Sequence, residues 1–194
     1  MFKHTLAAIL VATLSSAAFA GGEAAPQKSG HYMGIKWESQ DGKSGGVDAN
    51  TYGLTLGKKL SDNLSAEIYT RIKDADNTTN NTRLEGAVIG TMPLAGTLSA
   101  YARVGVGEKF VSGDNYSYWT AEPGLKLGLT DDLSVKAGVR WRDSFQTNHN
   151  QWDRTYKLGV GYKLTANTAV GVDYKVKRGD SEYDAVGVGY KVSF

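Results

Sequence analysis

The residues of this chain best suited to chemistry are lysines and arginines that recur at alternate positions of its apolar segments. In the segment 154–164, for example, Lys157 and Lys163 fall on one side and Leu158 and Tyr162 on the other. A row of cations on a low-dielectric wall attracts and concentrates anions. The candidate residues for such an anion track are Arg71, Arg83, Arg103, Lys126, Lys136, Arg140, Arg142, Lys157 and Lys175.

The same alternation assigns few acids to this polar face. Its cations would be Lys36, Lys59, Arg71, Lys73, Arg83, Arg103, Lys126, Lys136, Arg140, Arg142, Lys157, Lys163, Lys175, Lys177 and Lys191, and its acids Glu38, Glu67, Glu85, Glu122 and Asp173. The remaining acids, Asp153 among them, fall mainly in predicted loops and turns. Because an unpaired buried charge costs several kcal/mol, we expect the excess cations to be solvated by water.

The elements that must position these side chains show the period of two of a β-strand. The clearest example is the C-terminal segment, where Val188, Tyr190 and Val192 alternate with Gly189 and Lys191. Ten such segments are predicted, at 31–39, 50–60, 64–73, 82–93, 97–109, 117–129, 133–144, 154–164, 168–178 and 183–194. Most have the length of about ten residues that a tilted strand needs to cross a bilayer.

The connections between the segments alternate in length. Short turns are expected at 61–63, 95–96, 130–132 and 165–167, and longer polar loops between the other strands. Short turns on one side and long loops on the other are typical of outer-membrane barrels. Lipid does not tolerate a free strand edge, so the first and last strands must pair. The prediction is therefore an all-β, antiparallel, up-and-down transmembrane β-barrel of ten strands, with twelve or eight as alternatives.

Residues 1–20 read as an export signal rather than as part of the fold. Lys3 and His4 precede a short apolar run, and Ala18-Phe19-Ala20 matches a cleavage site, which predicts cleavage after Ala20. Residues 21–30 have no period and are expected to form a periplasmic lead, so that the barrel covers 31–194. The predicted location is the bacterial outer membrane. The chain has no cysteine and a mean hydropathy of −0.35, which argues against a helical membrane protein.

Two interpretations of the inward charges remain open. In one, they form a salt-bridge network that fills a narrow barrel, for which near-equal numbers of each sign are required. In the other, they line a water-filled conduit. Many inward positions are glycines, such as Gly57, Gly107, Gly124, Gly138 and Gly187, and would leave the bore less filled. The excess of cations favours the conduit.

Other chemistry has little support in the sequence. The expected mature chain has two histidines, His31 and His149, and His149 falls in a polar loop where an ordinary solvated histidine is the simpler interpretation. General acid–base catalysis needs a positioned pair of groups. We therefore expect no catalytic, cofactor-binding or metal-binding residues and no enzymatic activity. The basic residues also lack the clustered patch that binds nucleic acid.

The second half of the chain resembles a known family. Glu122-Pro-Gly-Leu, the segment from Leu129 to Arg142, and the C-terminal Val-Gly-Tyr-Lys-Val-Ser-Phe194 look like the oligogalacturonate-specific porins, the KdgM family. The resemblance implies a monomeric outer-membrane channel that passes acidic oligosaccharides along tracks of arginine and lysine, with Lys126, Arg140 and Arg142 as track residues. Members of that family have twelve strands, whereas ten are counted here, so the pore is expected to be narrower.

The leading expectation is an outer-membrane porin for passive diffusion of small anionic solutes, with acidic oligosaccharides as one solute class. The alternative is a non-conducting structural, adhesin or receptor barrel that acts through its extracellular loops. Expected partners are outer-membrane lipid and lipopolysaccharide, the barrel-assembly machinery through the strand that ends in Phe194, and small anionic solutes. No nucleic acid is expected as a partner, and the protein is expected to be a monomer.

Overall fold

The computed structural model describes residues 30–43, 47–75, 81–111, 115–146 and 152–194. The predicted export signal, almost all of the lead and His149 lie outside these residues. The described chain forms ten strands: β1 (His31–Gly42), β2 (Ala49–Ser61), β3 (Leu64–Ala75), β4 (Asn81–Ala95), β5 (Leu98–Val111), β6 (Tyr116–Gly128), β7 (Leu133–Ser144), β8 (Asp153–Lys163), β9 (Thr168–Gly179) and β10 (Tyr183–Ser193).

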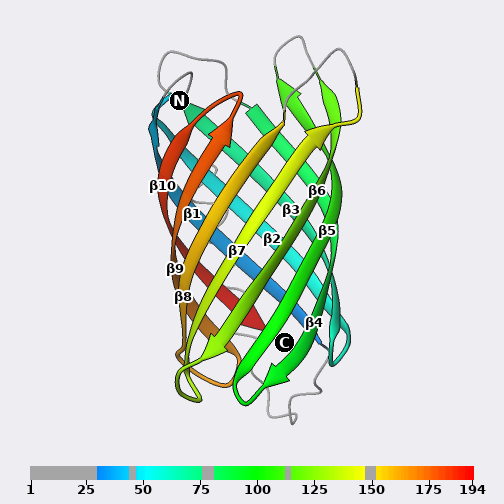
Figure 1. Cartoon of the computed structure of the whole chain (residues 1–194), viewed down its shortest axis with the longest axis vertical. Helices are drawn as coiled ribbons and strands as arrows, with labels where there is room; N and C mark the ends of the chain where they lie inside the picture. The colour runs from blue at the N-terminus through cyan, green and yellow to red at the C-terminus, as the bar shows by residue number, and fades with distance from the viewer. Residues whose placement is uncertain (1–29, 44–46, 76–80, 112–114, 147–151) are drawn as a thin grey trace.

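The strands close into one antiparallel, up-and-down barrel (Figure 1). Each strand pairs with its neighbours in sequence, and β1 pairs with β10 from Tyr32↔Ser193 to Gly42↔Tyr183. The backbone N–H of Phe194 donates to the carbonyl of His31 at 2.9 Å, which extends this closure to the end of the chain. The prediction of ten strands is confirmed. No described helix has the length and apolar character needed to cross a membrane.

The short turns lie together at one end of the barrel, called here the turn end, and the longer connections lie at the loop end. The turns Leu129–Asp132 and Leu164–Asn167 are built alike. In each, a threonine hydroxyl accepts a backbone N–H, from Leu133 to Thr130 at 2.9 Å and from Thr168 to Thr165 at 3.1 Å. Between β4 and β5, Gly96 has a φ of 54°, a conformation that favours glycine in a tight turn.

The barrel exposes apolar side chains on its outer face and buries polar side chains inside, which is the reverse of a soluble protein. Large apolar side chains point outward and are exposed, with Val104 at 61% and Ile68 at 58%. Polar side chains point inward and are buried, with Thr120 at 1% and Glu85 at 2%. Such a surface is stable where the outer face meets lipid rather than water. The predicted assignment of faces by alternation is therefore observed in the structure.

Exposed aromatic rings lie on the outer face, among them Trp37, Tyr52 and Trp119, as expected for the interfacial belts of a membrane barrel. Tyr32 differs from them: its side chain is 9% exposed, and its hydroxyl donates to Glu67 at 2.8 Å. Tyr32 therefore belongs to the lumen and not to the aromatic residues of the outer face.

Candidate functional site

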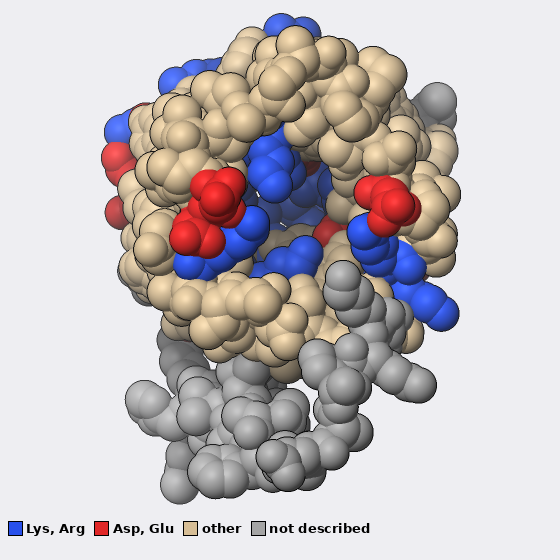
Figure 2. Space-filling view, turned by 90° about the horizontal axis from the view of Figure 1, so that it is seen from below, with Lys and Arg blue, Asp and Glu red and all other residues tan. Residues whose placement is uncertain are grey.

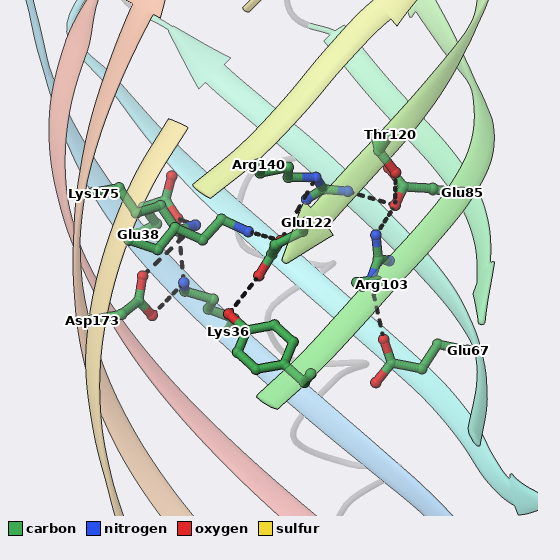
Figure 3. A network of polar contacts seen from close by, with 12 residues as sticks. Lys36, Glu38, Glu67, Glu85, Arg103, Thr120, Glu122, Arg140, Asp173 and Lys175 are labelled. Atoms are coloured by element: carbon green, nitrogen blue, oxygen red, sulfur yellow. Dashed lines mark hydrogen bonds and ion pairs between the residues drawn. The ribbon is translucent and has the colours of Figure 1, made fainter. Parts of the chain in front are cut away.

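The middle of the lumen is crossed by a network of ion pairs (Figure 3). We call this network the belt, and its members come from β1, β3, β4, β5, β6, β7, β8 and β9. The belt consists of Lys36, Glu38, Glu67, Arg71, Glu85, Arg103, Glu122, Arg140, Lys157, Asp173 and Lys175. All five acids predicted to face inward lie in it, so most of the pairing of unlike charges occurs in this layer.

Glu85 joins opposite parts of the belt. Its carboxylate accepts hydrogen bonds from Arg103 on β5 and from Arg140 on β7, the latter at 2.5 Å. The hydroxyl of Thr120 donates to the same oxygen at 3.3 Å. Because β4 and β7 are three strands apart in the barrel, the Arg140–Glu85 pair crosses the lumen rather than following its wall.

Glu122 and Glu38 are held in the same way by several cations. Lys157 donates to Glu122 at 2.5 Å, the guanidinium of Arg140 lies 3.9 Å from it, and the hydroxyl of Tyr101 donates to it at 3.2 Å. Glu38 accepts a hydrogen bond from Lys175 and lies 3.6 Å from the guanidinium of Arg71. Each buried carboxylate thus meets more than one positive group, as a buried charge requires.

The cations of the belt are more accessible than the glutamates at its centre. The side chains of Glu38, Glu85 and Glu122 are 3–5% exposed, whereas those of the belt cations are 10–25% exposed. Glu67 and Asp173 are exceptions, at 17% and 25%. Solvent in the lumen therefore meets mainly positive groups where the network is densest.

A second group of charges lies between the belt and the loop end. We call Lys73, Arg83, Lys109, Arg142 and Lys177, with the single acid Asp153, the loop-end cluster. Asp153 pairs with Arg142 and lies 3.4 Å from Lys177. The expectation that Asp153 belongs to a loop was wrong, because β8 begins at this residue and its side chain is 5% exposed inside the barrel.

The turn-end half of the lumen is wider. A cavity of about 540 Å³ opens there, bordered by Lys126, Lys136 and Lys191 and, on another side, by glycines such as Gly161 and Gly189. Figure 2 looks into this end and shows a hollow with blue Lys and Arg side chains inside it and red carboxylates at its rim. Among the described residues, none of these three lysines has an ion-pair partner. We call this space the turn-end chamber.

Inward glycines accommodate tyrosine rings. A Cβ on Gly57 would lie 2.2 Å from the ring of Tyr32, and one on Gly107 would lie 2.8 Å from the ring of Tyr118. The ring of Tyr101 covers Gly124 in the same manner, at 2.4 Å, and its hydroxyl oxygen would lie 2.3 Å from a Cβ on Gly138. The expectation that these glycines leave the bore open was therefore wrong at these positions.

Each of these tyrosines also carries a cation on its ring. The ammonium of Lys191 lies 3.5 Å from the ring centroid of Tyr32, and that of Lys136 lies 3.9 Å from the centroid of Tyr101. The guanidinium of Arg142 lies 5.5 Å from the centroid of Tyr118. Cation–π contacts of this kind fix where a positive charge stands. Three copies of a glycine–tyrosine–cation stack thus set the position of three lumen charges.

The structure places all nine candidate track residues inside the barrel, in three groups. Arg71, Arg103, Arg140, Lys157 and Lys175 lie in the belt, Arg83 and Arg142 in the loop-end cluster, and Lys126 and Lys136 in the turn-end chamber. Whether they line a conducting path stays a prediction. Sequence reasoning missed Asp153 and the inward tyrosines, although their positions alternate with outward residues in the same period of two. Among the described residues, no three His, Asp or Glu side chains could together hold a metal.

Comparisons with solved structures support this fold. The KdgM porin in complex with disordered oligogalacturonate is 14% identical, with a TM-score of 0.51 over 84% of this chain and 99% of that chain. The beta domain of the Bordetella autotransporter BrkA is 13% identical, with a TM-score of 0.55 over 87% of this chain and 100% of that chain. At these identities the likeness concerns the fold alone.

No curated protein matches the sequence. A family model described as "Outer membrane protein beta-barrel domain" matches residues 6–194. The closed barrel, its apolar outer face and its charged lumen agree with that match. Such barrels sit in the outer membrane of bacteria in contact with its lipid. This chain belongs to the family of outer membrane protein beta-barrel domains.

Proposed function

We propose that this chain is a passive, anion-preferring channel for small anionic solutes. The observation that supports this most directly is that cations of the belt are more exposed to the lumen than the glutamates with which they pair. Glu85 and Glu122 are 3–5% exposed, whereas Arg140 and Lys157 beside them are 20% exposed. A solute in the lumen therefore meets positive groups first, inside a low-dielectric wall that strengthens their field.

The cationic groups on either side of the belt support the same direction of selectivity. Lys126, Lys136 and Lys191 would raise the concentration of anions in the turn-end chamber, and the loop-end cluster would do so on the extracellular side. Between the belt and the loop-end cluster, side chains from both leave a cavity of only about 50 Å³. Acidic oligosaccharides are thus the largest solutes in the proposed class, and their passage would require the belt side chains to move.

Several further features belong to this proposal. The export signal at 1–20 is cleaved after Ala20, residues 21–30 lie in the periplasm, and the mature protein works as a monomer. The barrel-assembly machinery recognises the C-terminal strand that ends in Phe194, and lipopolysaccharide contacts the outer face of the barrel. The channel uses no cofactor or energy source and catalyses no reaction.

A non-conducting barrel is the second candidate, and one observation favours it. The Arg140–Glu85 pair crosses the lumen at 2.5 Å, and the Lys157–Glu122 pair lies beside it at the same distance. If these bridges remain closed, the protein would act through its extracellular loops as an adhesin, a receptor or a structural element. Purified protein in a planar lipid bilayer separates the two candidates: discrete current steps support the channel, and an intact barrel that passes no current contradicts it.

Reversing two lumen charges tests the direction of selectivity. The double variant Arg140→Glu with Arg142→Glu should shift ion preference toward cations, because both side chains face the lumen. Arg154→Glu is the matched control, since Arg154 is exposed on the outer face of β8. An unchanged preference in the double variant would place Arg140 and Arg142 outside the conduction path.

A further inference from the structure

A small cavity of about 50 Å³ lies between the belt and the loop-end cluster. A water molecule needs about 10–15 Å³ of such space. The cavity therefore has room for a few waters or for one compact anion. Four arginines and three lysines line it, against two carboxylates, Glu85 and Asp153. Glu38 and Glu122 of the belt also pair with lining cations, so seven cations meet four carboxylates here and the site keeps a surplus of positive charge.

Cations are directly opposite one another in the wall of this cavity. Arg71 on β3 is the register partner of Arg83 on β4, and Lys157 on β8 is the register partner of Lys175 on β9. Like charges at directly opposite positions destabilise a β-sheet. Lys157 and Lys175 are relieved by belt carboxylates, whereas Arg83 makes no ion pair among the described residues. A negative group near Arg83 would remove this repulsion.

Two donors and one acceptor at the cavity lack hydrogen-bond partners. The Nε atoms of Arg83 and Arg142 are buried and make no hydrogen bond within the described part of the chain, and Oδ2 of Asp153 meets Arg142 and Lys177 as ion pairs only. A buried donor without an acceptor is costly, and a guanidinium fork fits the paired oxygens of a tetrahedral oxyanion. The ammonium of Lys177 lies at the same cavity, where it donates to the hydroxyl of Ser181 at 2.6 Å. The site thus offers both charge and unfilled donors.

We propose that this cavity is a binding site for one compact tetrahedral oxyanion of the phosphate class. Arg83 and Arg142 bind its oxygens, and Lys177 adds positive charge on the loop side. The inference deepens the proposed channel function, and it rests on that function for the passage of the anion but not for its binding. An anion held here occupies the narrow part of the lumen, so phosphate should reduce a current carried by chloride.

Thermal unfolding of the purified full-length barrel in detergent tests the site with inorganic phosphate as the probe. Phosphate should raise the Tm above the value in chloride of equal ionic strength, because a ligand that binds only the folded state stabilises it. Isothermal titration of the wild-type protein with phosphate gives the Kd directly. No binding and no phosphate-specific rise in Tm would overturn the proposal.

Two variants locate the site. Arg83→Gln should weaken phosphate binding by about tenfold or more, because a charge-assisted hydrogen bond is lost. Arg154→Gln is the matched control, since it removes a cation from the outer face of β8, and it should keep wild-type affinity. Lys177→Gln provides a second test at the same cavity if Arg83→Gln does not fold. Equal losses in the cavity variants and in Arg154→Gln would contradict a discrete site.

Bilayer recordings separate failure of this site from failure of the channel. If chloride current is present and phosphate leaves it unchanged, the site is wrong and the channel stands. If no current is seen but phosphate binds and Arg83→Gln weakens it, the channel is wrong and the site stands. Block of chloride current by phosphate, relieved in Arg83→Gln, supports both.

Discussion

At the scale of single residues, the glycines of the lumen have two different roles. Gly57, Gly107, Gly124 and Gly138 lie under tyrosine rings, whereas glycines such as Gly161 line the turn-end chamber. A tyrosine ring against such a glycine fills the space that a side chain would take there, and it presents one face to a cation. The glycines therefore determine indirectly where Lys136, Lys191 and Arg142 stand.

Gly57→Ala should destabilise the barrel by about 1–3 kcal/mol, the usual cost of forcing extra atoms into a filled space. The new Cβ would lie 2.2 Å from the Tyr32 ring, which is held by its hydrogen bond to Glu67. Gly86→Ala is the matched control, because a Cβ there meets no atom within 4 Å and should change stability by no more than about 0.5 kcal/mol. Denaturant unfolding in lipid vesicles measures both, and equal costs would contradict the stacking account.

Tyr101→Phe tests the link between the stacks and the belt. This variant keeps the ring over Gly124 and Gly138 but loses the hydroxyl that donates to Glu122 at 3.2 Å. Stability should fall by about 1.5–3 kcal/mol, the range for a hydrogen bond to a charged group. Tyr162→Phe, whose ring is 47% exposed on the outer face, should be nearly neutral in the same unfolding measurement. A neutral Tyr101→Phe would show that the hydroxyl does not support the belt.

At the scale of the elements, the belt depends on closure of the barrel. Arg140 and Glu85 are 55 residues apart in sequence and meet only because β7 and β4 face each other across the lumen. Lys175 and Glu38 are 137 residues apart and meet because β1 pairs with β10, which brings β9 close to β1. Rigid strands joined by many backbone hydrogen bonds hold these side chains in place.

Arg140→Ala should open the belt. Single-channel conductance is expected to rise, because the bridge that crosses the lumen is removed, and anion preference should fall because a cation is lost. Glu85 keeps Arg103 and Glu122 keeps Lys157, so the loss of stability should stay below the about 3–5 kcal/mol seen when a buried charge loses its whole partner. Arg154→Ala, on the outer face, is the control. Unchanged conductance in Arg140→Ala would mean that the belt is not the narrow part of the path.

The strands and their facing could be predicted from the sequence because both depend on the local alternation of residue types. The partners within the lumen could not, because they depend on how far each strand is shifted along its neighbours, and a period of two does not encode that shift. Asp153 was missed because its predicted strand started at residue 154, one position too late. Tyr101 has the parity of the inward Arg103, so its facing could have been predicted, but its place against Gly124 depends on the register between β5 and β6.

At the scale of the whole molecule, the small net charge of +2 conceals a strong separation of charge. Glu38, Glu67, Glu85, Glu122 and Asp173 gather in the belt with their partners, and Asp153 alone of the inward acids named here lies in the loop-end cluster. The cations on both sides of the belt, such as Lys126, Lys136 and Arg83, exceed the acids near them. An anion entering from either end thus meets a positive region before the paired layer. This arrangement, rather than the total charge, is what predicts selectivity.

The reversal potential of wild-type protein in a planar bilayer under a potassium chloride gradient tests this claim most directly. Because cations outnumber acids along the lumen and the glutamates at the centre of the belt are the least exposed of its charges, the reversal potential should move toward the equilibrium potential of chloride. High salt should weaken the effect by screening. A reversal potential that moves toward the equilibrium potential of potassium, or a folded barrel that passes no current, would contradict the account.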